Sequence, residues 1–135
     1  MEDCLFCKII KGDIPCYKVY EDQDVFAFLD IAPVSYGHTL VVPKKHYINL
    51  EEIPKEDLCQ TIKAVKKIGK AIKYGMGKYG YNIQINNDPV AGQVIPHLHF
   101  HVIPRSEDDG LKLWPQSKYE GDDAEDVLKM IKRGL

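Results

Sequence analysis

The chain has 135 residues, of which 44% are hydrophobic and 28% charged, and its formal net charge is −2. This length and composition predict one soluble globular domain with a core that needs no disulfide staples. The near-neutral charge excludes the strongly basic field typical of proteins that bind nucleic acid or anionic membranes. With no apolar run near the ~20 residues of a membrane span and no apolar signal-peptide core at the N-terminus, we expect a cytoplasmic protein.

The first half of the chain predicts a short helix followed by strands. A helix is expected over 5–11, ended by Gly12. Two short apolar stretches, 17–20 and 25–29, flank an acidic link and predict a hairpin. A β-rich run over 39–42, closed by a proline, predicts a third strand.

The second half begins with the clearest helical pattern of the chain. Apolar residues spaced three and four apart predict one long helix over 53–72. Strands are expected over 81–85 and 98–103, and a last helix over 122–132 would turn an apolar side inward, formed by Val127, Leu128 and Ile131. The short links favour an α+β fold, an antiparallel sheet of about five strands with one long helix and short terminal helices.

Three of the five histidines, His97, His99 and His101, alternate with apolar residues. Successive side chains of a strand point to opposite faces, so the three imidazoles are expected to share one face while Leu98 and Phe100 anchor the other in the core. Alternate residues lie ~6.6 Å apart, so neighbouring imidazoles can reach one phosphate-sized group from two sides. The alternative is a metal-binding or incidental cluster, and the regular alternation disfavours an incidental one.

This alternation resembles the signature of the histidine triad superfamily of nucleotide hydrolases and transferases. The segments FLDI at 28–31, GHTLVVPKKH at 37–46 and AGQ at 91–93 are similar to further blocks of that superfamily. The likeness covers about residues 4–105 and leaves 106–135 as a tail of a single domain over 1–135. The pattern is most similar to the Hint branch of purine nucleoside phosphoramidases. It implies a homodimer whose sheet extends across the two chains through 81–85 and the long helix.

The resemblance implies a role for each of three histidines. His99, the middle one, would be the nucleophile that attacks the α-phosphorus, because a neutral imidazole carries a free lone pair at neutral pH. A backbone carbonyl would fix its tautomer. His101 would contact the phosphate or the leaving group, and His38 would lie behind the triad as its partner.

The resemblance also implies the substrate-binding residues. Asp30 would bind the ribose hydroxyls, since a carboxylate accepts two hydrogen bonds. The base would enter an apolar slot, although each residue of this slot could equally be plain core: Phe6, Ile9, Phe28 and Ile31.

A polar loop would bind the phosphate side of the substrate. Gly92, Gln93 and Val94 would offer backbone N–H groups to phosphate oxygens. Asn86 would contact the sugar or phosphate, with an ordinary turn residue as the alternative. Val94 stands where the Hint branch commonly has serine or threonine, so a hydroxyl contact to the leaving group is missing.

The pair Cys4 and Cys7 is spaced to share one face at a helix start. In a reducing compartment such a pair indicates metal or redox chemistry more often than a disulfide. His46 and His97 would complete a tetrahedral zinc site of the kind found in some bacterial triad hydrolases. With four protein ligands the zinc would be structural. The alternative is a pair of reduced cysteines without metal.

The resemblance therefore implies a hydrolase of purine nucleoside 5′-phosphoramidates or acyl-nucleotides, AMP or GMP derivatives, that forms a nucleotidyl-histidine on His99. One alternative is a dinucleoside polyphosphate hydrolase, a branch that tends to have glutamine in place of Asn86. Another is a nucleotide-binding scaffold without turnover. In the tail, Trp114 precedes a proline and is held extended. It would reach the partner's leaving-group side or, alternatively, close its own core.

Overall fold

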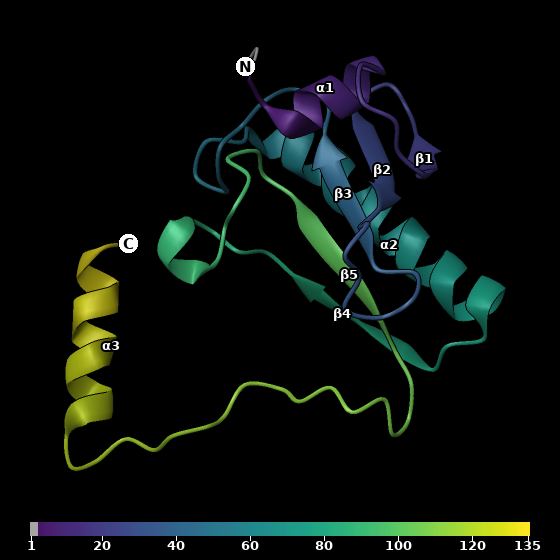
Figure 1. Cartoon of the computed structure of the whole chain (residues 1–135). Coiled ribbons are helices and arrows are strands. Elements are labelled where there is room, and N and C mark those ends of the chain that lie inside the picture. Colours follow the sequence, from purple (N-terminus) through teal and green to yellow (C-terminus); the bar gives the residue numbers. More distant parts are fainter. Residues whose placement is uncertain (1–2) are drawn as a thin grey trace.

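A computed structural model describes residues 3–135, so expectations that involve Met1 and Glu2 lie outside the described residues. The domain is an antiparallel sheet of five strands in the order β1-β2-β3-β5-β4, with helices on its two faces (Figure 1). The elements are α1 (Leu5–Lys11), β1 (Lys18–Glu21), β2 (Val25–Leu29), β3 (Thr39–Pro43), α2 (Lys55–Met76), β4 (Gly80–Gln84), η1 (Pro89–Ala91), β5 (Phe100–Arg105) and α3 (Asp123–Arg133). The α+β fold predicted from the sequence is confirmed.

The sheet is covered on both faces where β2 and β3 lie. Val25, Ala27 and Val41 belong to a core beneath α2, while Phe28 and Leu40 belong to a second core beneath α1. Because both faces are buried there, these strands are continuously apolar rather than alternating. The two cores fix α1 and α2 on opposite sides of the strands that carry the site.

The long helix α2 begins at Lys55 and ends at Met76, and Gly77 follows it in a left-handed conformation with φ of 64°. It therefore runs past Ile72, the expected end, and includes Gly75 within its last turn. Within the described residues 3–135, no helix is long and apolar enough to cross a membrane.

The strand β5 begins later than the sequence predicted. Leu98 and His99 precede it, because Leu98 N–H donates to Tyr47 O, 2.7 Å away in a neighbouring loop, instead of joining the sheet. Leu98 and Phe100 are nevertheless buried together beneath α2, so the alternation of side chains continues through the loop into the strand. The loop thus presents His99 on the face opposite to α2.

The last helix does not pack as expected. No residue of α3 is buried, so the predicted inner side with Val127, Leu128 and Ile131 is wrong. The reason is the path of the chain after β5. Arg105 is paired with Asp109 at 2.7 Å and donates to Leu111 O at 3.0 Å, which directs the chain away from the sheet. Residues 111–135, here called the arm, then carry α3 clear of the domain (Figure 1).

Candidate active site

The three histidines do not all face one surface. The rings of His99 and His101 lie with their centroids 4.9 Å apart and line the same pocket. His97 is fully buried, and its Nδ1 lies 3.5 Å from the Sγ of Cys4 at the start of α1. Phe6 of α1 packs edge to face on both His97 and His99, so these rings share one side of the chain as expected, but α1 covers His97 and keeps it out of the pocket.

The tautomer of His99 is set by the backbone. Its Nδ1 lies 2.7 Å from His97 O. A carbonyl oxygen can only accept, so Nδ1 carries the proton and the lone pair is left on Nε2. Burial lowers the pKa of His99 from its ordinary value, outweighing this hydrogen bond and the nearby Asp30 carboxylate, which raise it. His99 is therefore a neutral imidazole with a free Nε2, the form that a nucleophile requires.

His101 is oriented through a relay of two hydrogen bonds. Val34 N–H donates to His38 Nδ1 at 3.0 Å, so the proton of neutral His38 lies on Nε2. That Nε2 lies 2.9 Å from His101 Nδ1, which must then accept. The proton of His101 is left on Nε2, a buried atom without a hydrogen-bond partner in residues 3–135. The relay thus offers an unpaired N–H donor beside His99.

Burial keeps both members of this relay neutral. It lowers the pKa of His38, and together with the neighbouring His99 and His38 imidazoles it lowers the pKa of His101 to about 4. The contact of 3.8 Å between His38 Nε2 and Asp30 Oδ2 is therefore not an ion pair. Asp30, His38 and His101 place possible ligand atoms within 4.8 Å of one another, but a hydrogen bond joins the two imidazole nitrogens that would face a metal.

A pocket of about 340 Å³ opens in front of His99 and His101. Its polar side chains are Asp30, Asn86, His99 and His101, and the rest of its wall is almost wholly apolar. Of the expected slot residues, Phe6, Ile9, Phe28 and Ile31 all line it, together with Gly92 and Val94. Ile31 is 88% exposed and so lies at the rim rather than in the core.

Sequence reasoning missed part of the apolar wall. Ile14, Pro15 and Cys16, in the link between α1 and β1, line the same pocket, as do Leu5, Leu29, Leu40 and Ile95. The link has no motif or periodicity that would mark it. Its place follows from the end of α1, where Gly12 has a φ of 87° and Asp13 N–H donates to Lys8 O at 2.9 Å, which turns the chain toward the pocket.

The expected phosphate loop is held in shape mostly by its own side chains. Gln93 does not line the pocket, because its buried amide donates to Ile48 O at 2.7 Å and to Ile95 O at 3.1 Å. Its Oε1 accepts from Asp88 N at 2.9 Å. Asp88 has a φ of 76°, a conformation rarely adopted by a residue other than glycine. Gln93 thus acts as a clamp that fastens a strained loop.

Only part of the loop's backbone is free to donate. Gly92 N–H donates to Pro89 O at 3.0 Å and Gln93 N–H to Asp88 O at 3.3 Å. Val94 N–H donates to no acceptor within residues 3–135. The side chain of Asn86 is bound between Gln84 Nε2, at 2.8 Å, and Gly92 O, at 3.4 Å, so it braces the loop from the pocket side.

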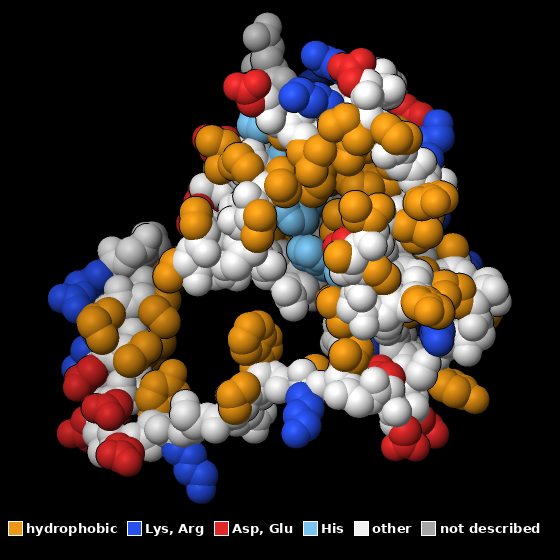
Figure 2. Space-filling view, in the orientation of Figure 1, with side chains coloured by type: hydrophobic (Ala, Val, Ile, Leu, Met, Phe, Trp, Pro, Cys, Tyr) orange, Lys and Arg blue, Asp and Glu red, His pale blue; other side chains and the backbone are white. Residues whose placement is uncertain are grey.

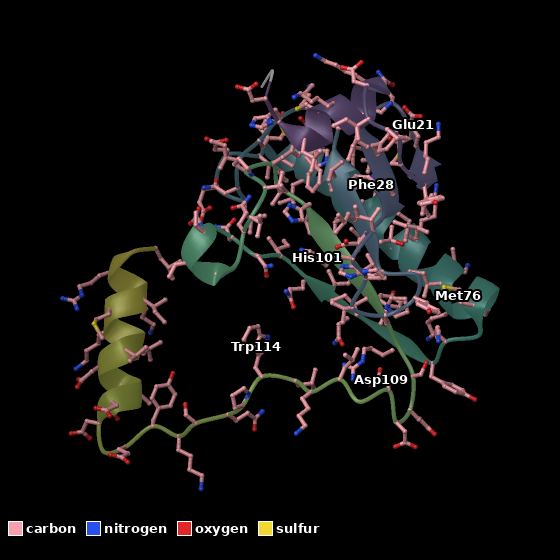
Figure 3. All side chains as sticks on the ribbon, viewed as in Figure 1. Glu21, Phe28, Met76, His101, Asp109 and Trp114 are labelled. Atoms are coloured by element: carbon pink, nitrogen blue, oxygen red, sulfur yellow. The ribbon has the colours of Figure 1, made fainter. Side chains whose placement is uncertain are left out.

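A second, more open groove of about 670 Å³ shares Asp30, Asn86 and His101 with the pocket. It lies on the face of β4 and β5 that α2 does not cover, and residues 111–115 form its other wall. Trp114 belongs to that wall and is 81% exposed, so the alternative that it closes the core is wrong. Its side chain points from the arm toward the body of the domain (Figure 3).

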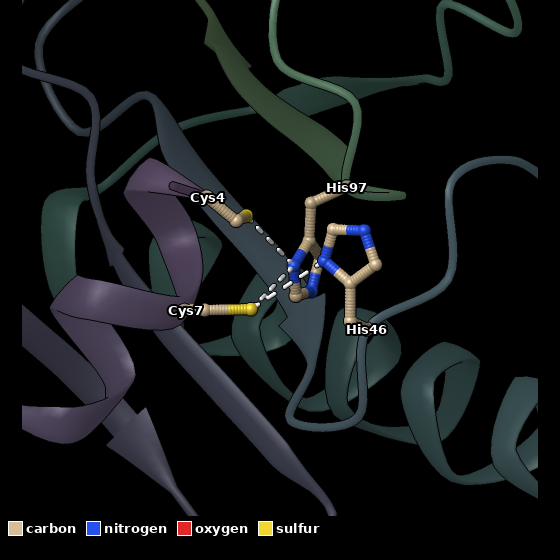
Figure 4. A group of neighbouring side chains, drawn as sticks. All are labelled: Cys4, Cys7, His46 and His97. Carbon is tan, nitrogen blue, oxygen red and sulfur yellow. Dashed lines mark hydrogen bonds between the residues drawn. The ribbon is translucent and has the colours of Figure 1, made fainter. Parts of the chain in front are cut away.

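Four possible metal ligands converge at the far end of the triad, beneath α1 (Figure 4). Cys7 Sγ lies 3.4 Å from His46 Nδ1 and 3.6 Å from His97 Nδ1. A tetrahedral zinc with ordinary bond lengths separates sulfur and nitrogen ligands by about 3.5 Å. His97 Nε2 lies 2.8 Å from Pro43 O and donates to it, so its Nδ1 lone pair faces the two cysteines. Geometry and donor set therefore fit a four-coordinate metal.

The electrostatics of these ligands agree with a cation-binding site. Burial and the neighbouring Cys4 thiol raise the pKa of Cys7 above its ordinary value. Without a cation the Cys7 thiol would stay protonated, whereas a bound metal would stabilise its thiolate.

Comparisons with known proteins agree with this geometry. A family model described as the HIT domain matches residues 11–108. The adenosine 5′-monophosphoramidase hnt1 of Schizosaccharomyces pombe is 47% identical over 83% of each chain. A crystal structure of a HIT family member from Bacillus subtilis is 43% identical, with a TM-score of 0.90 over 98% of this chain and 97% of that one. A zinc-bound histidine triad family protein from Mycobacterium smegmatis is 34% identical, with a TM-score of 0.79 over 99% of both.

The similarity to the B. subtilis structure includes the arm. Residues before the arm make up about four-fifths of the chain, so a superposition without the arm could not score above about 0.8. The observed score of 0.90 requires that much of the arm superpose as well.

Proposed function

The chain belongs to the HIT family, and we propose that it hydrolyses purine nucleoside 5′-phosphoramidates or acyl-nucleotides, AMP or GMP derivatives, to the nucleoside monophosphate. The observation that carries this proposal is the neutral His99 with a free Nε2 at the pocket, next to the unpaired Nε2–H of His101. The similarity to a protein named as an adenosine 5′-monophosphoramidase supports the same substrate class.

The pocket would hold the nucleoside. Its apolar wall gives room for a flat base, with Phe6 and Phe28 packed edge to face, their ring centroids 5.4 Å apart, as part of that wall. Asp30 has one carboxylate oxygen held by Ala32 N–H at 2.9 Å and would bind the ribose hydroxyls. Val94 N–H would donate to a phosphate oxygen. Gly92, which has no Cβ, would let the phosphate come close to the backbone of the loop.

The reaction would proceed in two steps on His99. Its Nε2 lone pair attacks the α-phosphorus, the bond from phosphorus to the leaving nitrogen or acyl oxygen breaks, and a nucleotidyl-histidine forms. His101 Nε2–H donates a hydrogen bond to the leaving atom, and an amine departs after taking up one proton from the solvent, whereas an acyl group departs as a carboxylate. Water then attacks the phosphorus, the bond from phosphorus to His99 Nε2 breaks, and the attacking water releases one proton to the solvent, so the net reaction consumes one water.

We propose a structural zinc on Cys4, Cys7, His46 and His97. Its chemistry would be to hold two thiolates and two imidazoles together, which ties α1 to the loop before β5 and fixes His97. His97 O is the acceptor that sets the tautomer of His99, so the metal site would position the nucleophile from behind. The zinc-bound relative from M. smegmatis supports zinc as the metal.

We further propose a homodimer that pairs through β4 and α2, with the whole chain forming one domain whose tail begins at residue 106. β4 is the last strand of the sheet and has no neighbour on its outer side within residues 3–135. Four free cysteines support a reducing, cytoplasmic location.

A substrate panel tests the proposed activity. The purified protein is given an adenosine 5′-phosphoramidate, its guanosine counterpart, lysyl-AMP and diadenosine tetraphosphate, and relative turnover is measured. We expect the phosphoramidates and lysyl-AMP to be hydrolysed fastest. Faster cleavage of diadenosine tetraphosphate would favour the polyphosphate hydrolase, and AMP binding without turnover of any compound would favour a scaffold.

A further inference from the structure

Two amide side chains of β4 border the open groove next to the imidazoles of the site. Gln84 is the Cα partner of His101 across the ladder between β4 and β5, and Asn82 is the partner of Ile103. Side chains directly opposite each other in an antiparallel pair lie on one face, with their Cβ atoms about 5 Å apart. Gln84 therefore lies beside His101, and both line the groove together with Asn86.

The orientation of the Gln84 amide is fixed by the loop that carries Gly92. A carbonyl oxygen can only accept, so Asn86 contributes Nδ2 to its contact with Gly92 O at 3.4 Å, and its Oδ1 is left for another donor. That donor is Gln84 Nε2, at 2.8 Å. The carbonyl end of the Gln84 amide, Oε1, accepts no hydrogen bond within residues 3–135. The groove thus holds a fixed and free acceptor beside His101.

The amide of Asn82 is fixed the other way round. Arg105 Nη1 can only donate, and it lies 2.8 Å from Asn82 Oδ1. The free end of this amide is therefore Nδ2, which is a donor. Alternate side chains of a strand lie ~6.6 Å apart on the same face, so the donor of Asn82 is one step farther from His101 than the acceptor of Gln84.

The leaving group of the proposed substrate has to pass this acceptor. His99 would attack the phosphorus from the pocket, and in phosphoryl transfer the bond that breaks lies roughly in line with the bond that forms, on its far side. His101 lines both the pocket and the groove, so the leaving group departs past His101 into the groove. The space-filling view shows histidine side chains in the middle of this face, between apolar side chains and the open space that the arm borders (Figure 2).

The free acceptor can recognise a hydrogen on the leaving atom. The nitrogen of a phosphoramidate offers a lone pair to His101 Nε2–H and an N–H to a second group. The bridging oxygen of an acyl-nucleotide or a dinucleoside polyphosphate has no hydrogen and would face Gln84 Oε1 as one acceptor against another. The N–H also becomes a stronger donor as the amine takes up its proton, so its hydrogen bond strengthens toward the transition state.

We propose that Gln84 is a specificity-determining residue, whose free Oε1 accepts a hydrogen bond from the leaving-group N–H and so favours phosphoramidates over nucleotides cleaved at a bridging oxygen. The inference rests on the proposed function and narrows its substrate class. It adds no bond-making step, because the bonds to phosphorus that form and break are those of the reaction on His99.

Two substrates that differ by one methyl group test the acceptor. The value of kcat/KM is measured for adenosine 5′-(N-propyl)phosphoramidate and for its N-methyl derivative, which lacks the N–H. The wild type is expected to favour the N–H substrate, and Gln84→Met to lower this preference about tenfold, the size of one hydrogen bond to a group that gains charge. Gln84→Glu keeps an acceptor but cannot donate to Asn86, so it should keep the preference while slowing both substrates.

Asn82→Ala is the matched control. It removes an amide from the same face of β4, but one whose free end is a donor and cannot accept from the leaving group. The preference for the N–H substrate is expected to stay at its wild-type value in this variant. Melting temperatures of all three variants check that β4 keeps its place in the sheet.

The outcomes separate the role of Gln84 from the proposed reaction. An unchanged preference in Gln84→Met, or an equal loss for both substrates in Gln84→Met and Gln84→Glu, would show that Gln84 only braces Asn86. Either result overturns the inference, while turnover by the wild type leaves the proposed function in place. Absence of turnover of both substrates by the wild type would overturn the proposed function itself.

Binding gives a second readout that needs no turnover. In His99→Ala, dissociation constants are measured by calorimetry for the same propyl phosphoramidate and for the propyl ester of AMP, which has oxygen in place of the N–H. The phosphoramidate is expected to bind about threefold more tightly, as for one hydrogen bond between neutral groups, and the added change Gln84→Met to remove this difference. Equal affinities with Gln84 in place would overturn the inference.

Discussion

The hydrogen-bond relay from Val34 through His38 to His101 predicts how two substitutions of His38 will differ in their effect on hydrolysis. Replacing His38 by leucine removes the donor that holds His101 Nδ1, whereas replacing it by glutamine leaves an amide N–H that can donate to the same atom. Hydrolysis of an alkyl phosphoramidate should slow in His38→Leu and be largely restored in His38→Gln. The physical reason is that His101 presents Nε2–H to the leaving group only while Nδ1 accepts.

The size of the effect follows from the hydrogen bond that is lost. Leaving a buried polar atom without its partner costs about 1–3 kcal/mol. If that cost falls on the orientation of His101 in the transition state, kcat should fall by roughly 5- to 150-fold, at about 1.4 kcal/mol for each factor of ten. The nucleophile keeps its own hydrogen bond to His97 O, so formation of the nucleotidyl-histidine is not otherwise impaired.

The assay compares two leaving groups on the same nucleotide. An amine needs a donor as it departs, whereas a nitrophenolate leaves as a stable anion, so only the amine substrate should be slowed in His38→Leu. Equal slowing of both substrates would indicate that His38 merely supports the fold, and an unchanged rate with the amine would refute the relay. Melting temperatures of both variants serve as the control for folding.

Three further predictions follow from the site. His99→Ala should lower turnover by several orders of magnitude with little change in melting temperature, and near wild-type turnover would refute the nucleophile. About one zinc per chain should copurify, and Cys7→Ser should lower both the zinc content and the melting temperature; a metal-free protein that resists reconstitution and melts at the same temperature would contradict the site. Burial lowers the pKa of His101 from 6.5 to about 4, so between these pH values the unfolded chain binds more protons than the folded one. The free energy of unfolding that His101 contributes is therefore fully present above about pH 6.5 and is lost as the pH falls toward 4. Denaturant unfolding at several pH values should show the free energy of unfolding of the wild type falling relative to that of His101→Gln on acidification, and a relative rise would contradict the assigned sign.

The sequence predicted the residues of the site better than their surroundings. The alternation of His97, His99 and His101 with apolar residues is a local pattern, and local patterns carry over directly into strands and their approaches. The spacing of Cys4 and Cys7 likewise needs only one turn of helix. Bringing His46 to the same cluster needs the whole sheet, and its inclusion rested on the resemblance to a known family.

Features decided by distant contacts were beyond the sequence. Gln93 was expected to offer its backbone N–H, yet that N–H donates to Asp88 O, and the side chain is held by Ile48 O, which is 45 residues away in the chain. The strand β5 begins at Phe100 rather than at the expected Leu98, because Leu98 N–H donates to Tyr47 O. The amphipathic pattern of α3 was read correctly as a helix, but periodicity alone does not say which molecule an apolar face will meet.

The four buried or half-buried histidines around the site are chemically the same side chain, and the backbone gives them different roles. Pro43 O accepts a hydrogen bond from Nε2–H of His97, so Nδ1 faces the cysteines. His97 O accepts a hydrogen bond from Nδ1–H of His99, so the Nε2 lone pair is free to attack phosphorus. Val34 N–H occupies Nδ1 of His38, which makes its Nε2 the donor to the next ring. Since each ring has only two nitrogens, one backbone contact decides what the other nitrogen can do. A substitution that alters these backbone contacts would therefore change the chemistry of the site while leaving every histidine in place.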